Sequence, residues 1–175
     1  AGNYNTFIGN NAGSAITNAT HNVMIGDYAG ASAGDVDKVV FIGQNAAANG
    51  AITDDADGTI AIGQSALTAL TSGEFNLAVG YLAGTALTTG DGNITIGHQA
   101  GKALVLGSSN TVIGVNALLT CVGDDASNAG RYNVCVGRDT MGAANNDGHA
   151  NCEIDGNVAI GNGALYGGSF GSSNK

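Results

Sequence analysis

The chain has 175 residues, 30 of them glycine, with neither proline nor tryptophan, and its formal net charge is -9. This composition argues against binding to DNA, RNA or an anionic membrane, because the five lysine and arginine residues cannot build a basic patch. No apolar run approaches the length of a transmembrane helix, and no signal peptide stands before the first motif.

The motif Asn-x-x-Ile-Gly-x-x-Ala begins at Asn5 and returns along the whole chain. The distances between successive motif glycines are 17, 17, 20, 17, 17, 17, 23 and 24 residues. A fixed period with occasional lengthening indicates a solenoid, in which each repeat forms one coil and the insertions fall in one loop. The nine motif glycines, taken below as position 0 of each repeat, are Gly9, Gly26, Gly43, Gly63, Gly80, Gly97, Gly114, Gly137 and Gly161.

Each repeat opens with asparagine at position -4, except where Val39 and Thr59 replace it. In register, stacked amides form a ladder that satisfies their polar groups along the solenoid axis. The predicted ladder consists of Asn5, Asn22, Asn76, Asn93, Asn110, Asn133 and Asn157.

A short strand follows each asparagine. Isoleucine or valine stands at position -1, and a second residue suited to a strand stands at position -3, so the two share one apolar face. The residue between them varies from Phe7 to Ala61, so the second face is also largely shielded from water. Strands that are apolar on both faces belong to buried parallel stacks. The position -1 stripe consists of Ile8, Ile25, Ile42, Ile62, Val79, Ile96, Ile113, Val136 and Ile160.

Alanine stands at position +3 in eight repeats, often followed by glycine, as in Ala12-Gly13. Small residues there let the chain turn back close to the strand. A helix is the rival interpretation of the alanine column, but a 17-residue period that holds a strand and a turn leaves too little room for one. We therefore predict an all-β fold: a parallel β-solenoid, or β-roll, of about nine coils with a 17-residue period. Residues 1–175 form a single repeat array, a rod of roughly 40 Å at the usual strand spacing.

A thin coil with many small residues has a poor core, and the second apolar face needs a neighbour. We expect a parallel homotrimer around the Ile/Val stripe, because closed rotational symmetry lets identical faces meet. Adding one period to Asn157 reaches Asn174, and neither end of the chain resembles a capping repeat. We therefore expect the chain to be a segment of a longer fibre.

The connectors are short and polar in the first two coils. The third, 47–59, carries the acidic run Asp54 to Gly58, which is interpreted as a solvated turn. The last two, 118–133 and 141–157, hold the largest insertions, and such loops often carry binding function.

Four consecutive repeats place an acid at position -6, namely Asp37, Asp57, Glu74 and Asp91. Turn chemistry explains this column first, since Asp-Gly pairs open tight turns. The alternative is an axial row of Ca²⁺ ions bound by these oxygens, against which Arg131 in the same column argues. No other cofactor is indicated.

Cysteines and histidines show no recurring pattern. Cys135 occupies a strand position and is expected to be an inert packed side chain. A disulfide between Cys121 and Cys152 in the inserted loops is a further hypothesis. The three histidines, His21, His98 and His149, fall at different phases of the repeat, and no nucleophile motif accompanies them. We therefore predict that the chain is not an enzyme.

The repeated Asn-x-x-Ile-Gly-x-x-Ala unit resembles the head repeats of trimeric autotransporter adhesins and the similar repeats of bacteriophage tail fibres. The resemblance covers nearly the whole chain and implies a trimer of parallel β-rolls, with the Ile and Gly columns toward the threefold axis, that serves attachment to a host or cell surface. This chain differs from the adhesin heads in its longer, less uniform period and its three insertions, which favours the phage fibre. No binding residue carries over, because the matching positions are structural.

The function we expect is a structural shaft or head segment of an extracellular attachment fibre, on a virion or a cell surface. Its partners would be copies of itself and a cell-surface glycan or protein receptor, with no nucleic acid and no membrane insertion. Two alternatives are a self-assembling structural filament or matrix protein and a glycan-cleaving trimeric β-helical fibre, although the carboxylate pair that the latter needs is not seen. Exposed aromatic residues are candidate ligand contacts: Tyr28, Tyr81 and Tyr132, with Tyr4 and Phe75 in the column of Tyr132.

Overall fold

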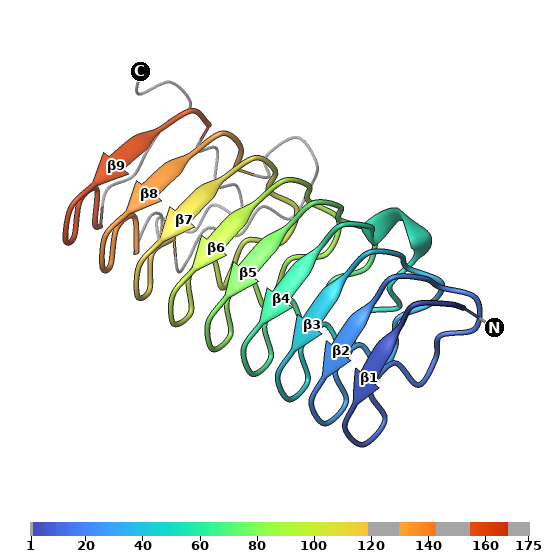
Figure 1. Cartoon of the computed structure of the whole chain (residues 1–175). Coiled ribbons are helices and arrows are strands. Elements are labelled where there is room, and N and C mark those ends of the chain that lie inside the picture. Colours follow the sequence, from blue (N-terminus) through green and yellow to red (C-terminus); the bar gives the residue numbers. More distant parts are fainter. Residues whose placement is uncertain (1, 119–129, 143–154, 168–175) are drawn as a thin grey trace.

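The computed structural model describes residues 2–118, 130–142 and 155–167 (Figure 1). Nine three-residue strands lie side by side in chain order in one parallel sheet, and they run from β1 to β9 without a crossover. The parallel β-solenoid expected from the repeat is confirmed. The strands are β1 Thr6–Ile8, β2 Val23–Ile25, β3 Val40–Ile42, β4 Ile60–Ile62, β5 Leu77–Val79, β6 Ile94–Ile96, β7 Thr111–Ile113, β8 Val134–Val136 and β9 Val158–Ile160.

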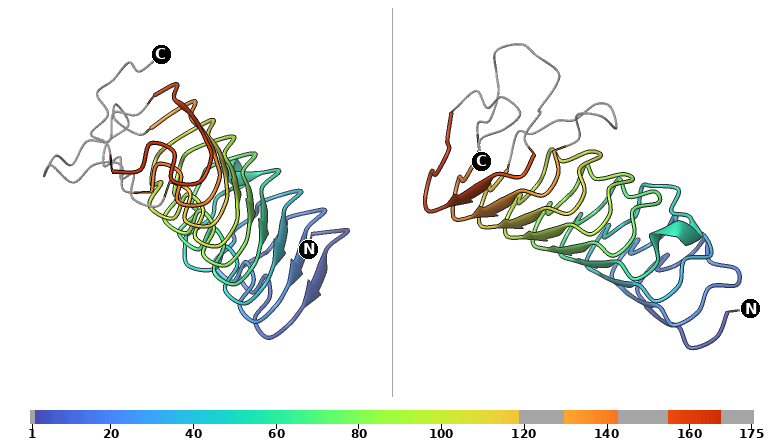
Figure 2. Two further views of the ribbon diagram at one scale, coloured as in Figure 1. Left: turned by 90° about the vertical axis from the view of Figure 1, so that its left-hand side faces the viewer. Right: turned by 90° about the horizontal axis from the view of Figure 1, so that it is seen from above.

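Every strand pairs with its neighbour in the register of the repeat. Ile62 pairs with Val79 across a 17-residue repeat, and Ile113 pairs with Val136 across a 23-residue one. The inserted residues therefore leave the sheet undisturbed, because the whole insertion is taken up in the connector. Figure 2 shows the coils following one another along the rod with their strands on one side.

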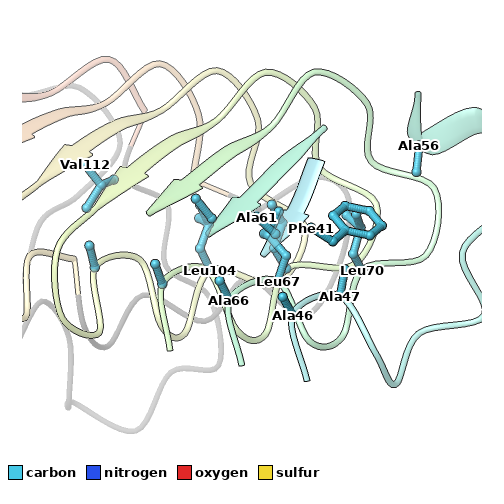
Figure 3. Close-up of a cluster of buried hydrophobic side chains, with 14 of the residues drawn as sticks. Phe41, Ala46, Ala47, Ala56, Ala61, Ala66, Leu67, Leu70, Leu104 and Val112 are labelled. Atoms are coloured by element: carbon cyan, nitrogen blue, oxygen red, sulfur yellow. The ribbon is translucent and has the colours of Figure 1, made fainter. Parts of the chain in front are cut away.

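The middle residue of each strand points into the coil. Met24, Phe41 and Val112 are completely buried and belong to one core cluster. Figure 3 shows Phe41 and Val112 in this core with leucines of the returning segment such as Leu67 and Leu104. The first and third residues of each strand lie on the opposite, outer side of the sheet. The Ile/Val stripe is thus not buried within one chain, because the coil interior is filled from the other face of the strands.

Two positions share the space inside each coil: position -2, the middle residue of the strand, and position +4, on the returning segment. A small residue at one of them makes room for a large residue at the other. A Cβ atom added to Gly30 would lie 2.5 Å from Sδ of Met24, and one added to Gly101 would lie 2.8 Å from Cγ2 of Thr95.

In the fourth coil, where the strand contributes only Ala61, position +4 carries the buried Leu67. In the fifth coil both positions are small, Ala78 and Gly84, and a Cβ atom added to Gly84 would lie 2.9 Å from Cδ2 of Leu67 in the coil before. Glycine at this position therefore makes room for a larger neighbour in the core.

The asparagine ladder runs along the inside of the last five coils. The Asn110 amide donates to Oδ1 of Asn93 over 3.0 Å, and the Asn133 amide donates to Oδ1 of Asn110 over the same distance. Each of these side chains is at most 2% exposed. Thr59 replaces the amide in the fourth coil, where its hydroxyl accepts the Asn76 N–H at 3.3 Å. Amide-to-amide stacking is thus present in the last five coils. The amides of Asn5 and Asn22 donate instead to the carbonyls of Ala19 and Val36, and Val39 follows them in the third coil.

The helical interpretation of the alanine column finds no support in the described residues, whose one helical segment is the 3-10 turn η1, Asp54–Ala56. It falls in the acidic run of the third connector, where Ala56 is buried and Asp54 and Asp55 are exposed. Across the same described ranges, no helix combines the length and apolarity needed to cross a membrane.

Candidate functional site

The outer apolar face is defined by the first and third residues of the nine strands. Only Thr6 and Thr111 on it are polar. In-register pairing aligns like positions of neighbouring strands, so each of the two columns continues along the full sheet. Seven of the nine position -1 residues are partly shielded by their neighbours along the stack, while Ile8 and Ile160 at the two ends are 58% and 68% exposed. A continuous apolar surface of this kind is a candidate interaction site.

Three of the four consecutive acids at position -6 accept a hydrogen bond from the backbone of the coil before them. Oδ1 of Asp57 accepts the N–H of Asp37 at 2.7 Å, and Oδ1 of Asp91 accepts the N–H of Glu74 at 3.0 Å. Oδ1 of Asp37 accepts the N–H of Thr20 in the same way. Each of these three aspartates thus satisfies a backbone donor at the corner of the preceding coil, as expected of turn residues.

Asp57, Glu74 and Asp91 of this column border a hollow of about 450 Å³ beside η1, whereas Asp37 does not line it. Among the described residues, no group of three or more histidine, cysteine, aspartate or glutamate side chains is arranged to hold a metal ion. The hollow gives the rod one strongly acidic patch. Its lining residues are Asp54, Asp55, Asp57, Ser72, Glu74, Thr89 and Asp91.

The aromatic candidates are scattered along the rod. Tyr4, Phe75 and Tyr132 occupy position -5, where they are 80%, 65% and 66% exposed. Their φ angles of 61°, 55° and 58° lie in the left-handed region, which is uncommon for bulky side chains, and glycine occupies the same position in three other coils. Tyr28 and Tyr81 follow the strand at positions +2 and +1 and are each 44% exposed. The structure does not bring these five rings into one cluster.

The two described histidines each stack on a tyrosine of a neighbouring coil. The Tyr4 and His21 ring centres are 4.9 Å apart, and those of Tyr81 and His98 are 5.3 Å apart. His149, like Cys121 and Cys152 of the proposed disulfide, lies outside the described residues.

Cys135 is the buried middle residue of β8, with its Sγ atom 3.1 Å from Sδ of Met141. Burial raises the pKa of the Cys135 thiol to about 12, so it stays protonated at neutral pH. A protonated thiol packed on a thioether is a core element without nucleophilic character.

Sequence reasoning recognised the apolar columns of this surface and expected copies of the chain to meet along the Ile/Val stripe, but it did not say which face of each strand the coil itself encloses. The alternation of residues separates the two faces of a strand, and both faces here are apolar, so the pattern could not say which one the coil encloses. No protein-family model matches the chain, nor does any curated protein or solved structure. The outer apolar face is accordingly the strongest candidate functional surface of this β-solenoid.

Proposed function

We propose that the chain is a structural shaft or head segment of an extracellular attachment fibre, in which three parallel copies cover their outer apolar faces against one another. The observation that carries the proposal is the continuous outer apolar face, which a single chain leaves in contact with water. Burying apolar surface contributes about 25 cal/mol per Å², so a face that extends along nine strands favours association strongly. The resemblance of the repeat to adhesin heads and tail fibres supports three copies and a role in attachment.

The geometry of the rod suits this function. Neighbouring strands are held by in-register pairing along the whole described sheet, so the coils form a stiff spacer that can hold a receptor-binding element away from a surface. In this proposal the rod carries no catalytic group, and the exposed aromatic rings are secondary candidates for contact with a glycan. The role of the acidic hollow is to keep a rod of low charge soluble.

The proposal is tested by light scattering coupled to size exclusion at low protein concentration. A mass of about three times the 17.1 kDa chain is expected. Ile96→Asp should reduce that mass to a single chain while the circular dichroism of the sheet is retained, because Ile96 lies on the half-exposed outer face of β6. A wild-type mass of one chain would contradict the trimer.

Val115→Asp is the matched control. Val115 is 41% exposed at position +1, where the second coil naturally carries Asp27. The same kind of apolar-to-carboxylate change, placed outside the outer apolar face, should leave the mass unchanged. If both variants dissociate equally, the interface is not the one proposed.

A further inference from the structure

The turn that follows each strand brings position +1 of the repeat to the surface of the rod, in the row of loops beyond the arrowheads of Figure 1. Glycine always precedes this position and alanine follows two residues later in eight coils, whereas position +1 itself changes from coil to coil. The carbonyl of Gln64 accepts the N–H of Leu82 at 3.0 Å, and the carbonyl of Tyr81 accepts the N–H of Gln99 at 2.8 Å. The fold thus fixes the backbone at position +1 and leaves the choice of side chain open.

Four consecutive coils in the middle of the rod carry exposed side chains without a carboxylate, lysine or arginine at this position. The same backbone hydrogen bonds join all four coils, so the four side chains follow one another at the strand spacing of about 4.8 Å. They form the +1 row, which consists of Gln44, Gln64, Tyr81 and His98.

The polar groups of the +1 row are available to a ligand. In the first two coils the same column is satisfied internally, because the Asn10 amide donates to Oδ1 of Asp27 at 3.0 Å. Within the described residues, none of the four side chains of the +1 row makes such a hydrogen bond or an ion pair. The amides of Gln44 and Gln64 therefore keep their donors and acceptors for an incoming molecule.

Two rings occupy the end of the +1 row. Those of Tyr81 and His98 stack with their centres 5.3 Å apart and their planes 26° apart, and Tyr81 remains 44% exposed. Because each ring restricts the other, less rotational freedom is lost when a ligand contacts them. The pair is a preorganised aromatic surface that also carries the phenol hydroxyl.

The turns that carry these rings depart from the rest of the repeat. Leu82 and Gln99 follow the rings at position +2, with φ angles of 55° and 56° in the left-handed region, which is uncommon for such side chains. Backbone strain of this kind is concentrated at functional sites. Six of the other seven coils carry a small or amide residue or an aspartate at position +2, namely Asn11, Asn45, Ser65, Asn116, Asp139 and Gly163.

Rings beside amides suit a carbohydrate. Aromatic rings contact the apolar faces of sugar rings, while amides and a phenol exchange hydrogen bonds with sugar hydroxyls. A row that follows the rod for four coils matches an extended chain of sugars better than a single one. Acidic sugars are disfavoured, since the row holds no lysine or arginine and the chain has a net charge of -9.

We propose that the +1 row binds a neutral oligosaccharide that lies along the rod. Tyr81 and His98 contact the faces of its sugar rings, and Gln44 and Gln64 hydrogen-bond to its hydroxyls. The inference rests on the proposed attachment role, for which it names the class of receptor. It does not require the trimer, because the +1 row lies beyond the strand ends and outside the outer apolar face.

The test is binding of the whole chain to an array of immobilised neutral and sialylated oligosaccharides. Wild type should bind neutral members of the array. Tyr81→Ala should weaken binding to the best of them about tenfold or more, as loss of a central aromatic contact does. Tyr81→Phe keeps the ring and should bind more tightly than Tyr81→Ala. Phe75→Ala is the matched control, because Phe75 is a 65% exposed ring of the same coil at the other end of β5, and it should bind like wild type.

Retained circular dichroism shows for each variant that the coils are folded. The inference is overturned if wild type binds no neutral oligosaccharide of the array or only sialylated ones. It is also overturned if folded Tyr81→Ala binds like wild type, or if Phe75→Ala weakens binding as much as Tyr81→Ala does. Light scattering on the same samples reports the trimer separately: a trimer that binds no oligosaccharide contradicts this inference alone, and a single chain that binds one contradicts the trimer alone.

Discussion

The side-chain amide of Asn93 donates to Oδ1 of Asn76 over 3.0 Å and to the backbone carbonyl of Gly107 over 2.7 Å, while its own Oδ1 accepts from Asn110. One buried residue thus joins the coil before it to the coil after it. Because each amide serves as donor and acceptor in turn, the ladder links the last five coils through the core as well as through the sheet.

Replacing Asn93 by alanine should remove the acceptor of the Asn110 backbone N–H and of one Asn110 amide N–H, and the donor to the Gly107 carbonyl, while the Asn110 amide keeps its bond to Gly130. We expect the free energy of unfolding to fall by about 1–3 kcal/mol for each group that loses its partner, as measured by urea denaturation. Asn157→Ala is the control, since the Oδ1 atom of that residue has no partner in the described structure, and it should cost clearly less. Equal losses of unfolding free energy in Asn93→Ala and Asn157→Ala would contradict the view that the hydrogen bonds accepted by the inner asparagines stabilise the ladder.

The motif glycines are required by contact between coils as well as by backbone conformation. Gly97 and Gly161 have similar φ angles of 131° and 126°, but only Gly97 has the carbonyl of the next coil above it. Gly97→Ala should therefore lower the melting temperature more than Gly161→Ala, which carries the conformational strain alone. The difference between the two melting temperatures measures the destabilisation caused by the clash with the next coil. Equal melting temperatures would mean that backbone strain alone explains why glycine occupies position 0.

The volume balance between Thr95 and Gly101 can be measured with a double-mutant cycle. Gly101→Ala should destabilise the fold by overpacking against Cγ2 of Thr95, at about 1–3 kcal/mol. Adding Thr95→Ala should relieve this contact, so the double variant should be more stable than the sum of the single changes predicts by about 0.5–3 kcal/mol. Ala47, with φ of 50°, shows that alanine is accommodated at this position when its surroundings allow it. If the effects of Gly101→Ala and Thr95→Ala on stability simply add, the two side chains do not compensate for each other directly.

An exposed carboxylate makes stability depend on pH. Asp35 accepts the N–H of Asn18 at 2.8 Å and the hydroxyl of Thr17 at 2.8 Å, and these bonds hold its pKa below the ordinary value of 3.8. The carboxylate therefore contributes stability that is fully present above pH 3.8 and is lost as the pH falls through the lower folded-state pKa.

Asp35→Asn should lower the free energy of unfolding at neutral pH, and the difference from wild type should shrink as the pH is lowered through that range. Urea denaturation at a series of pH values measures it, with Asp54→Asn on the exposed turn η1 as control. A difference that stays constant down to the lowest pH would contradict a charge-dependent role for Asp35.

Much of the fold follows from the sequence alone. The glycine spacing and the recurring asparagine determined the register of all nine strands, because each strand must repeat the contacts of the one before it. Insertions before Gly137 and Gly161 did not obscure this register, since they lie in connectors. The asparagine ladder was equally predictable, because only stacking along the axis satisfies so many amides in so apolar a repeat.

Only the tertiary structure decided which face of the strands is enclosed. The middle column runs from Phe7 to Ala159 and looks less regular than the Ile/Val stripe, yet it forms the core, because the residue at position +4 of the returning segment is small beside Met24 and Thr95 and large beside Ala61. Such compensation between positions -2 and +4 becomes visible only when coils are stacked. The more uniform stripe lies outside the coil, because the first and third residues of each strand point away from the side that the returning segment closes.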